Sequence, residues 1–155
     1  MIDRRMFMTG LAAALAPAPA ALGATSAADS PLMKVVRAPD CGCCGAWIDH
    51  LRAAGFAVDV TMSDDVAAFK EQHGVPQALW SCHTALVQGY LIEGHVPARD
   101  ILRLLDERPD AVALTVPGMP WGAPGMGPEA ERDAYDVILI RRDGGTEVFA
   151  RYPAA

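Results

Sequence analysis

Residues 32–51, "LMKVVRAPDCGCCGAWIDHL", decide the fold because they join a strand pattern to a helix pattern through three cysteines. The β-branched run at residues 32–38 predicts a strand. The segment "PDCGCCG" interrupts that run, and residues 45–54 then carry apolar side chains at helical spacing, beginning with Trp47. A strand that passes into a helix through a C-x-x-C-type motif is typical of a thioredoxin-like domain.

The rest of the chain continues this alternation of strands and helices. The patterns predict a strand at residues 56–60, a short helix ending at His73, two strands within residues 84–94, a helix from Pro97 and a hairpin within residues 135–152. This order predicts an α/β domain over residues 29–155, thioredoxin-like, with a mixed central sheet, flanking helices and an added C-terminal β-hairpin. In that topology the third strand runs antiparallel to the first, so Cys82 and His83 should lie beside the three clustered cysteines.

The N-terminal residues 1–28 have the anatomy of an export signal peptide. Arg4 and Arg5 precede an Ala/Leu-rich run and then small residues. The paired arginines favour a twin-arginine signal, with an ordinary secretory signal as the alternative. Prolines break the apolar run, so we expect no stable membrane anchor. The pattern predicts an exported, periplasmic protein.

Charge and length restrict the possible partners. The 155 residues include 13 Lys and Arg against 19 Asp and Glu, a formal net charge of -6. No basic stripe occurs, which argues against a nucleic-acid-binding surface. The length suits one domain after removal of the signal.

The four cysteines, Cys41, Cys43, Cys44 and Cys82, all follow the signal. In an oxidising compartment the default is two disulfides. A bridge between the adjacent Cys43 and Cys44 would be strained, and one between Cys41 and Cys43 would close a very small ring. Cys82 offers a long-range partner to only one of the three. We therefore expect at most one unstrained long bridge, with two thiols left for a metal or for redox exchange.

Soft ligands surround this motif in the sequence. A helix N-terminus favours thiolates, and Cu(I) prefers thiolate, thioether and imidazole donors. Met119 and Met126 each stand in a Pro-Gly-Met triplet of a surface loop, either as ligands or as gap-filling side chains. Zinc or an iron–sulfur cluster could use four cysteines, but neither explains the methionines.

The histidines differ in their expected roles. His83 follows Cys82 directly, so it is a candidate metal ligand or a candidate hydrogen-bond partner of a ligand. His95 precedes the third helix and is a weaker candidate for the site. His50 and His73 fall in predicted helices and are expected on the solvated surface.

Three motifs, "CGCCGAWIDHLRAAGF", "SCHTALVQGYLIEGHVPARDILRLL" and "VPGMPWGAPGMG", together resemble the CopG-like family of periplasmic copper-resistance proteins. The resemblance covers about residues 33–127. It implies a thioredoxin-like fold and a multinuclear Cu(I)–cysteine cluster that serves copper resistance. By motif position it implies Cys41, Cys43, Cys44 and Cys82 as cluster ligands, with His83, Met119 and Met126 as the other motif residues.

Two classes of function follow from these patterns. The first is a periplasmic copper-binding protein, with copper ions and other periplasmic copper-handling proteins as partners. A copper-linked thiol oxidoreductase step is left open within it. The second is a metal-independent thiol–disulfide oxidoreductase, which the C-x-x-C spacing of Cys41 and Cys44 permits. A structural disulfide protein would leave two thiols without a role.

Overall fold

The predicted strands and helices are present, together with one further strand, in the structure, a computed structural model that describes residues 30–155. The predicted signal peptide over residues 1–28 lies outside the described residues. Within residues 30–155, no helix combines the length and the apolarity needed to cross a bilayer. The elements are β1 (Leu32–Arg37), α1 (Gly42–Ala53), β2 (Ala57–Met62), α2 (Val66–Gln72), the 3-10 helix η2 (Gln77–Leu79), β3 (His83–Val87), β4 (Tyr90–Glu93), α3 (Ala98–Glu107), β5 (Ala111–Thr115), the 3-10 helix η3 (Glu129–Glu131), β6 (Tyr135–Arg141) and β7 (Thr146–Tyr152).

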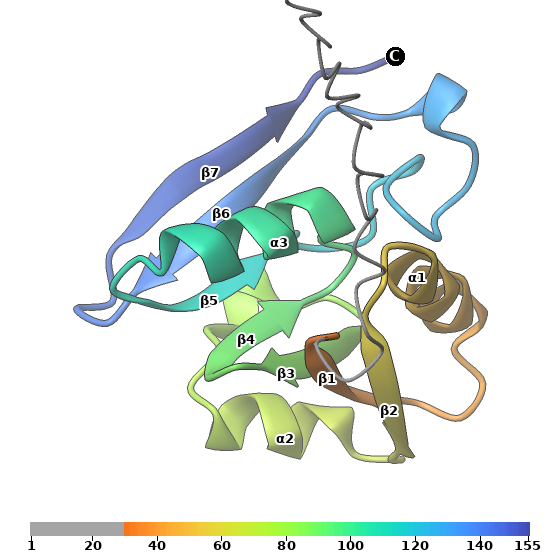
Figure 1. Ribbon diagram of the computed structural model, residues 1–155. Helices are drawn as coiled ribbons and strands as arrows, with labels where there is room; N and C mark the ends of the chain where they lie inside the picture. Colours follow the sequence, from red (N-terminus) through yellow and green to blue (C-terminus); the bar gives the residue numbers. More distant parts are fainter. Residues whose placement is uncertain (1–29) are drawn as a thin grey trace, which may run out of the picture.

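The strands form one mixed sheet of seven, in the order β2-β1-β3-β4-β5-β6-β7 (Figure 1). β1 pairs with β2 in parallel and with β3 antiparallel, and β4 pairs with β5 in parallel. The register of β1 and β3 places Arg37 opposite His83. The first residue of β3 and the last residue of β1 therefore lie at the same end of their strands, as the predicted topology requires.

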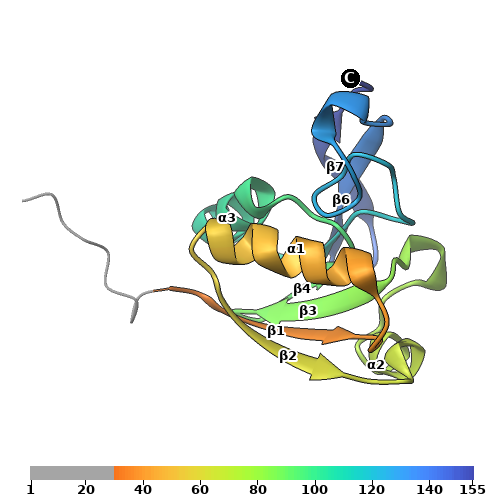
Figure 2. The same cartoon turned by 90° about the vertical axis from the view of Figure 1, so that its right-hand side faces the viewer.

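Helices cover both faces of this sheet. α1 and α3 lie against one face, and α2 lies against the other (Figures 1 and 2). The main core fills the α1/α3 side, where Trp47, Leu51 and Ile101 are fully buried against the strands. A smaller cluster lies on the α2 side and includes Val75 and Leu91. Successive residues of a strand thus face different cores, because side chains alternate across the sheet.

The connection between β3 and β4 is the predicted tight turn. Gln88 and Gly89 have positive φ values of 46° and 91°. A two-residue turn with both residues in the left-handed region matches the twist of antiparallel strands. The sequence prediction of two strands turning at Gln88 and Gly89 is confirmed.

Strand β5 was absent from the sequence prediction, and it changes the role of the C-terminal hairpin. β5 pairs with β4 on one side and with β6 on the other. The predicted hairpin of β6 and β7 therefore continues the main sheet. Four of the five β5 residues are buried, so the strand shows no polar alternation. A short apolar run of this kind cannot be distinguished from other buried segments by periodicity.

The loop of residues 116–128 packs against α1 at Gly125. A Cβ on Gly125 would lie 2.6 Å from the Trp47 backbone nitrogen and 2.9 Å from the Cys43 carbonyl oxygen. Gly125 also has a positive φ of 83°. Glycine is required here twice over, by the backbone conformation and by the close approach to α1.

We predict that Gly125→Ala destabilises the protein more than Gly144→Ala does. Gly144 has nearly the same φ, 85°, but faces open space. Gly144→Ala should cost about 1 kcal/mol for the left-handed conformation. Gly125→Ala should cost at least about 2 kcal/mol, because the contact with α1 adds overpacking. Denaturant unfolding of both variants measures the difference, and equal losses would contradict the packing argument.

Candidate metal centre

The cysteine motif caps and opens helix α1. Cys41 is the N-cap residue, and the helix begins at Gly42, three residues before the predicted start at residue 45. Arg37 donates a hydrogen bond from Nη1 to the Cys41 carbonyl oxygen at 2.8 Å, which fixes the turn between β1 and α1. Cys43 and Cys44 thus lie in the first helical turn, where unpaired backbone N–H groups favour anionic sulfur.

The four cysteine sulfurs lie close together. Cys82 Sγ is 3.8 Å from Cys43 Sγ and 3.6 Å from Cys44 Sγ. Cys41 Sγ is 3.5 Å from Cys43 Sγ. All four sulfurs lie within 4.8 Å of one another. The structure therefore brings together the four cysteines that the sequence singled out, from α1 and from the residue before β3.

One pair of these cysteines is bridged. Cys41 and Cys44 form a disulfide across three positions of sequence, and Cys43 and Cys82 are free thiols. The cysteine spacing predicted at most one long bridge, to Cys82, whereas the bridge that forms is the short C-x-x-C one between Cys41 and Cys44. The helical turn supplies the reason, because it places the Cys41 and Cys44 Cα atoms 5.4 Å apart, within the range of disulfides.

His95 joins the site more closely than the sequence suggested. Its Nε2 lies 3.1 Å from Cys82 Sγ, and its Nδ1 lies 2.8 Å from the Pro124 carbonyl oxygen. Because a carbonyl oxygen only accepts, Nδ1 carries the proton and donates to Pro124. In the neutral ring Nε2 then presents a lone pair toward Cys82. The sequence signal for this contact is weak, since His95 is thirteen residues from Cys82 and reaches it only through the β3–β4 hairpin.

His83 is fully buried on the same side of the sheet. Its Nδ1 lies 3.2 Å from Cys82 Sγ, and its ring packs on Trp47 with centroids 4.2 Å apart. Its Nε2 is buried without a hydrogen-bond partner among the described residues. Buried polar atoms are rarely left unpaired, so this nitrogen is available to a ligand.

Burial shifts the pKa values of Cys82, His83 and His95 toward the neutral forms. Burial first, and then the neighbouring Cys43 thiol, raises the pKa of Cys82 to about 12. Burial, and next the nearby charge of His95, lowers the pKa of His83 well below its usual value. Burial also lowers the pKa of His95, against the opposing effect of its hydrogen bond to Pro124. A bound cation would reverse this balance for the thiol, because metal binding displaces thiol protons.

The two methionines that were predicted as possible ligands lie on the surface loop of residues 116–128. Met119 is 57% exposed and borders a shallow groove with Pro117 and Ile138. Met126 is half-buried, directly after the Gly125 contact with α1. The loop thus places Met126 near the first turns of α1 and leaves Met119 open to solvent.

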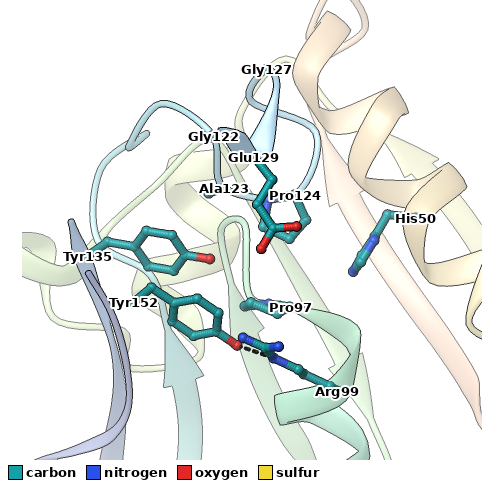
Figure 3. A pocket seen from close by; sticks show the side chains of 10 residues that line it. All are labelled: His50, Pro97, Arg99, Gly122, Ala123, Pro124, Gly127, Glu129, Tyr135 and Tyr152. Atoms are coloured by element: carbon teal, nitrogen blue, oxygen red, sulfur yellow. Dashed lines mark hydrogen bonds between the residues drawn. The ribbon is translucent and has the colours of Figure 1, made fainter. Parts of the chain in front are cut away.

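Pro124, whose carbonyl oxygen accepts a hydrogen bond from His95, also lines a cavity of about 230 Å³ (Figure 3). His50 and Arg99 line it together with Tyr135, Tyr152 and loop residues. His50 was expected on the solvated surface. It is half-buried instead, and its Nε2 accepts a hydrogen bond from the Ala98 backbone N–H at 3.0 Å. His50 therefore ties α1 to the start of α3.

His73 ends α2, where its Nδ1 lies 2.8 Å from the Phe69 carbonyl oxygen. Its ring also packs on Phe69, with centroids 4.1 Å apart. These contacts are local to α2, and His73 belongs to neither group of potential metal-binding side chains.

The donor set fits a soft metal ion. The four sulfurs form one group of potential ligands, and Cys82, His83 and His95 form a second group that shares Cys82. Thiolate and imidazole are the donors that Cu(I) prefers. The Cys41–Cys44 disulfide must be reduced before all four sulfurs can bind a metal as thiolates.

Comparison with known proteins gives three findings. A family model described as "Protein of unknown function, DUF411" matches residues 79–126. Two solved structures of the copper resistance protein CopG, Form 1 and Form 2, are each 46% identical to this chain. Each match covers 81% of this chain and 100% of the solved one, with a TM-score of 0.77. The search of curated proteins returned no significant match.

We predict that the metal-free protein loses stability as the pH falls from 6.5 to 5.5. His83 and His95 have lowered pKa values when folded, so the unfolded chain binds more protons in this range. Stability should rise with pH through about 6.5 and level off about one pH unit above it, with a slope of no more than about 1.4 kcal/mol per pH unit for each group. Denaturant unfolding across this range measures the slope, and His83→Phe should reduce it. An unchanged slope in His83→Phe would contradict the assignment.

Proposed function

Because the chain belongs to the family of the copper resistance protein CopG, we propose that it is a periplasmic copper-binding protein of copper resistance and homeostasis. The proposed form of the copper is Cu(I), held in a cysteine-bridged multinuclear cluster. The observation that carries this proposal is the group of four cysteine sulfurs within 4.8 Å of one another. A thiolate sulfur can bridge two copper ions, so a compact set of sulfurs suits a cluster better than a single ion.

A redox role is the second part of the proposal. Reduced Cys41 and Cys44 would each give one electron to a Cu(II) ion. Two Cu(II) ions become two Cu(I) ions, two thiol protons are released, and the Cys41–Cys44 disulfide forms. Cys43 and Cys82 remain as thiol donors in that state, with two imidazoles beside Cys82. The protein would then act as a copper-linked thiol oxidoreductase.

Met119 and Met126 are proposed as additional soft donors. The exposure of Met119 suits a first contact with copper from solution, and the half-buried Met126 lies between that surface and α1. A thioether binds Cu(I) without needing to lose a proton, so these contacts would not depend on pH.

The proposal includes the fold family and the compartment. The strand order β2-β1-β3-β4, with β3 antiparallel to β1, supports a thioredoxin-like core. The sequence pattern of residues 1–28 supports export to the periplasm, by the twin-arginine route in the proposed form. Other copper-handling proteins of that compartment are the proposed partners.

A metal-independent thiol–disulfide oxidoreductase is the second candidate. The observation that favours it is the Cys41–Cys44 disulfide at the start of α1, with the C-x-x-C spacing of redox motifs. In that function the two imidazoles and the third and fourth sulfurs would have no direct part.

The copper content of purified protein tests the first candidate. Protein from copper-loaded cells, purified without oxygen, should hold several copper ions per chain. Cys82→Ser should hold fewer and lose them more readily to a Cu(I) chelator, because it removes the sulfur shared by both ligand groups. Met33→Leu is the matched control. It removes a buried sulfur from β1 four positions before Arg37 and should leave the copper content unchanged.

Copper-free wild-type protein under these conditions, or Cys82→Ser with a full copper content, would refute the copper cluster. A disulfide-reductase assay on the metal-free protein separates the second candidate. We expect slow reduction of a disulfide substrate, and inhibition when Cu(I) is added. Activity comparable to that of thioredoxin and unaffected by copper would establish the alternative.

A further inference from the structure

A buried ion pair lies on the α2 face of the sheet, opposite to the face that carries the cysteine group. Lys70 of α2 and Glu93 of β4 are joined through Lys70 Nζ and Glu93 Oε1, and both side chains are buried. Lys70 Nζ also donates to Thr84 Oγ1 at 2.9 Å. Removing two such charges from water costs several kcal/mol in general, so a buried pair needs a reason beyond stability.

Glu93 connects this ion pair to the residues on both sides of Cys82 and His83. Its Oε1 accepts a hydrogen bond from the Ser81 backbone N–H at 2.5 Å. Its Oε2 accepts one from Thr84 Oγ1, also at 2.5 Å. We call Lys70, Ser81, Thr84 and Glu93 the Glu93 network. Both of its anchor points, Ser81 and Thr84, directly adjoin the Cys82–His83 pair.

The alternation of strand β3 separates this network from the cysteine group. His83 faces the α1 side, where it contacts Trp47, and Thr84 faces Lys70 from α2. Thr84 is paired with Glu93 in the register of β3 and β4, so both side chains lie on the α2 face. The network therefore contacts the backbone of residues 81–84 from the α2 face and leaves the α1 face free for ligands.

Cys82 depends on such support because it precedes the first ladder residue. β3 begins at His83, and the preceding 3-10 helix ends at Leu79. The main chain around Cys82 is anchored by the Glu93 bond to Ser81 and by the bond from the Gly94 N–H to the His83 carbonyl oxygen at 3.0 Å. The loop of residues 116–128 adds two contacts at Gly118, whose carbonyl oxygen accepts from Ser81 Oγ and whose N–H donates to the Trp80 carbonyl oxygen. A Cβ on Gly94 would lie 2.4 Å from Ser81 Cβ, so this turn also packs directly on Ser81.

We propose that Lys70 and Glu93 are positioning residues for Cys82, which they hold through Ser81 and Thr84 at the distance the four-sulfur site requires. The function assigned to that site rests on the proposed function above, but the positioning itself does not. Glu93 accepts three hydrogen bonds in fixed directions, which an apolar side chain could not do. Lys70 neutralises the charge that this carboxylate brings into the interior.

The experiment uses a short bifunctional thiol reagent, dibromobimane, on metal-free protein with the Cys41–Cys44 disulfide intact. The reagent becomes strongly fluorescent when it links two thiols, and the free thiols of Cys43 and Cys82 are 3.8 Å apart. The test variant Lys70→Met/Thr84→Val/Glu93→Leu replaces the network by apolar groups of similar volume, a change that proteins often tolerate. Its cross-linking rate should fall about tenfold, the lower end of what loss of ligand-orienting partners costs.

Two further variants keep the test decisive. Lys70→Met/Glu93→Gln removes both charges but keeps a carbonyl oxygen for the Ser81 N–H, and it should cross-link at close to the wild-type rate. Thr84→Val leaves the ion pair and the Glu93 bond to Ser81 in place, and it removes the two hydrogen bonds of Thr84 Oγ1, one from Lys70 Nζ and one to Glu93 Oε2. It should slow cross-linking at least about fivefold, the effect expected for loss of a single hydrogen bond. Alkylation of Cys43 by iodoacetamide should be unchanged in all of them.

Wild-type cross-linking rates in the folded triple variant, or in Thr84→Val, would overturn the proposal. Copper retention against a Cu(I) chelator is measured on the same proteins, and the triple variant should lose copper about tenfold more readily than wild type. If wild-type protein binds no copper while the variants still cross-link slowly, the proposed function fails and the positioning role stands. If copper binds but cross-linking is unaffected, the positioning role fails alone.

Discussion

Strands β1 and β3 run antiparallel, and their register sets Arg37 opposite His83. Everything in the site depends on this pairing. Arg37 is the last residue of β1, and α1 begins five residues later, so its cysteines lie at this end of the strands. His83 is the first residue of β3, which runs antiparallel to β1, so Cys82 lies at the same end of the strands. A shift of one residue would send His83 to the α2 face and take Cys82 away from Cys43 and Cys44.

The two faces of the sheet carry different kinds of polar side chain. On the α1 side lie sulfur and imidazole groups that burial keeps neutral, with the pKa of Cys82 raised and that of His83 lowered. On the α2 side lies a charged pair that is hydrogen-bonded to Thr84 and to the Ser81 backbone N–H. Neutral soft donors on one face and fixed charges on the other leave the first face suited to a cation that can displace thiol protons.

The proposed function assigns two chemistries to the same sulfurs, and the start of α1 shows how one geometry could serve both. One helical turn brings Cys41 and Cys44 to disulfide distance while it leaves Cys43 free to face Cys82. A bridged state therefore keeps one pair of thiols, and a reduced state offers four. His95 links the site to the loop of residues 116–128 through its hydrogen bond to the Pro124 carbonyl oxygen.

By itself, the sequence determined the alternation of strands and helices, the tight turn at Gln88 and Gly89 and the cysteine-rich helix start, because these depend on local periodicity and turn chemistry. It also indicated that Cys82 would meet the other cysteines, since chain direction in the expected sheet implies it. Tertiary structure alone decided the pairing of β5, whose buried residues lack alternation, and the choice of the Cys41–Cys44 bridge. It also decided the approach of His95 to Cys82 and of Lys70 to Glu93. These contacts join residues far apart in sequence, and only the register of the strands fixes their distances.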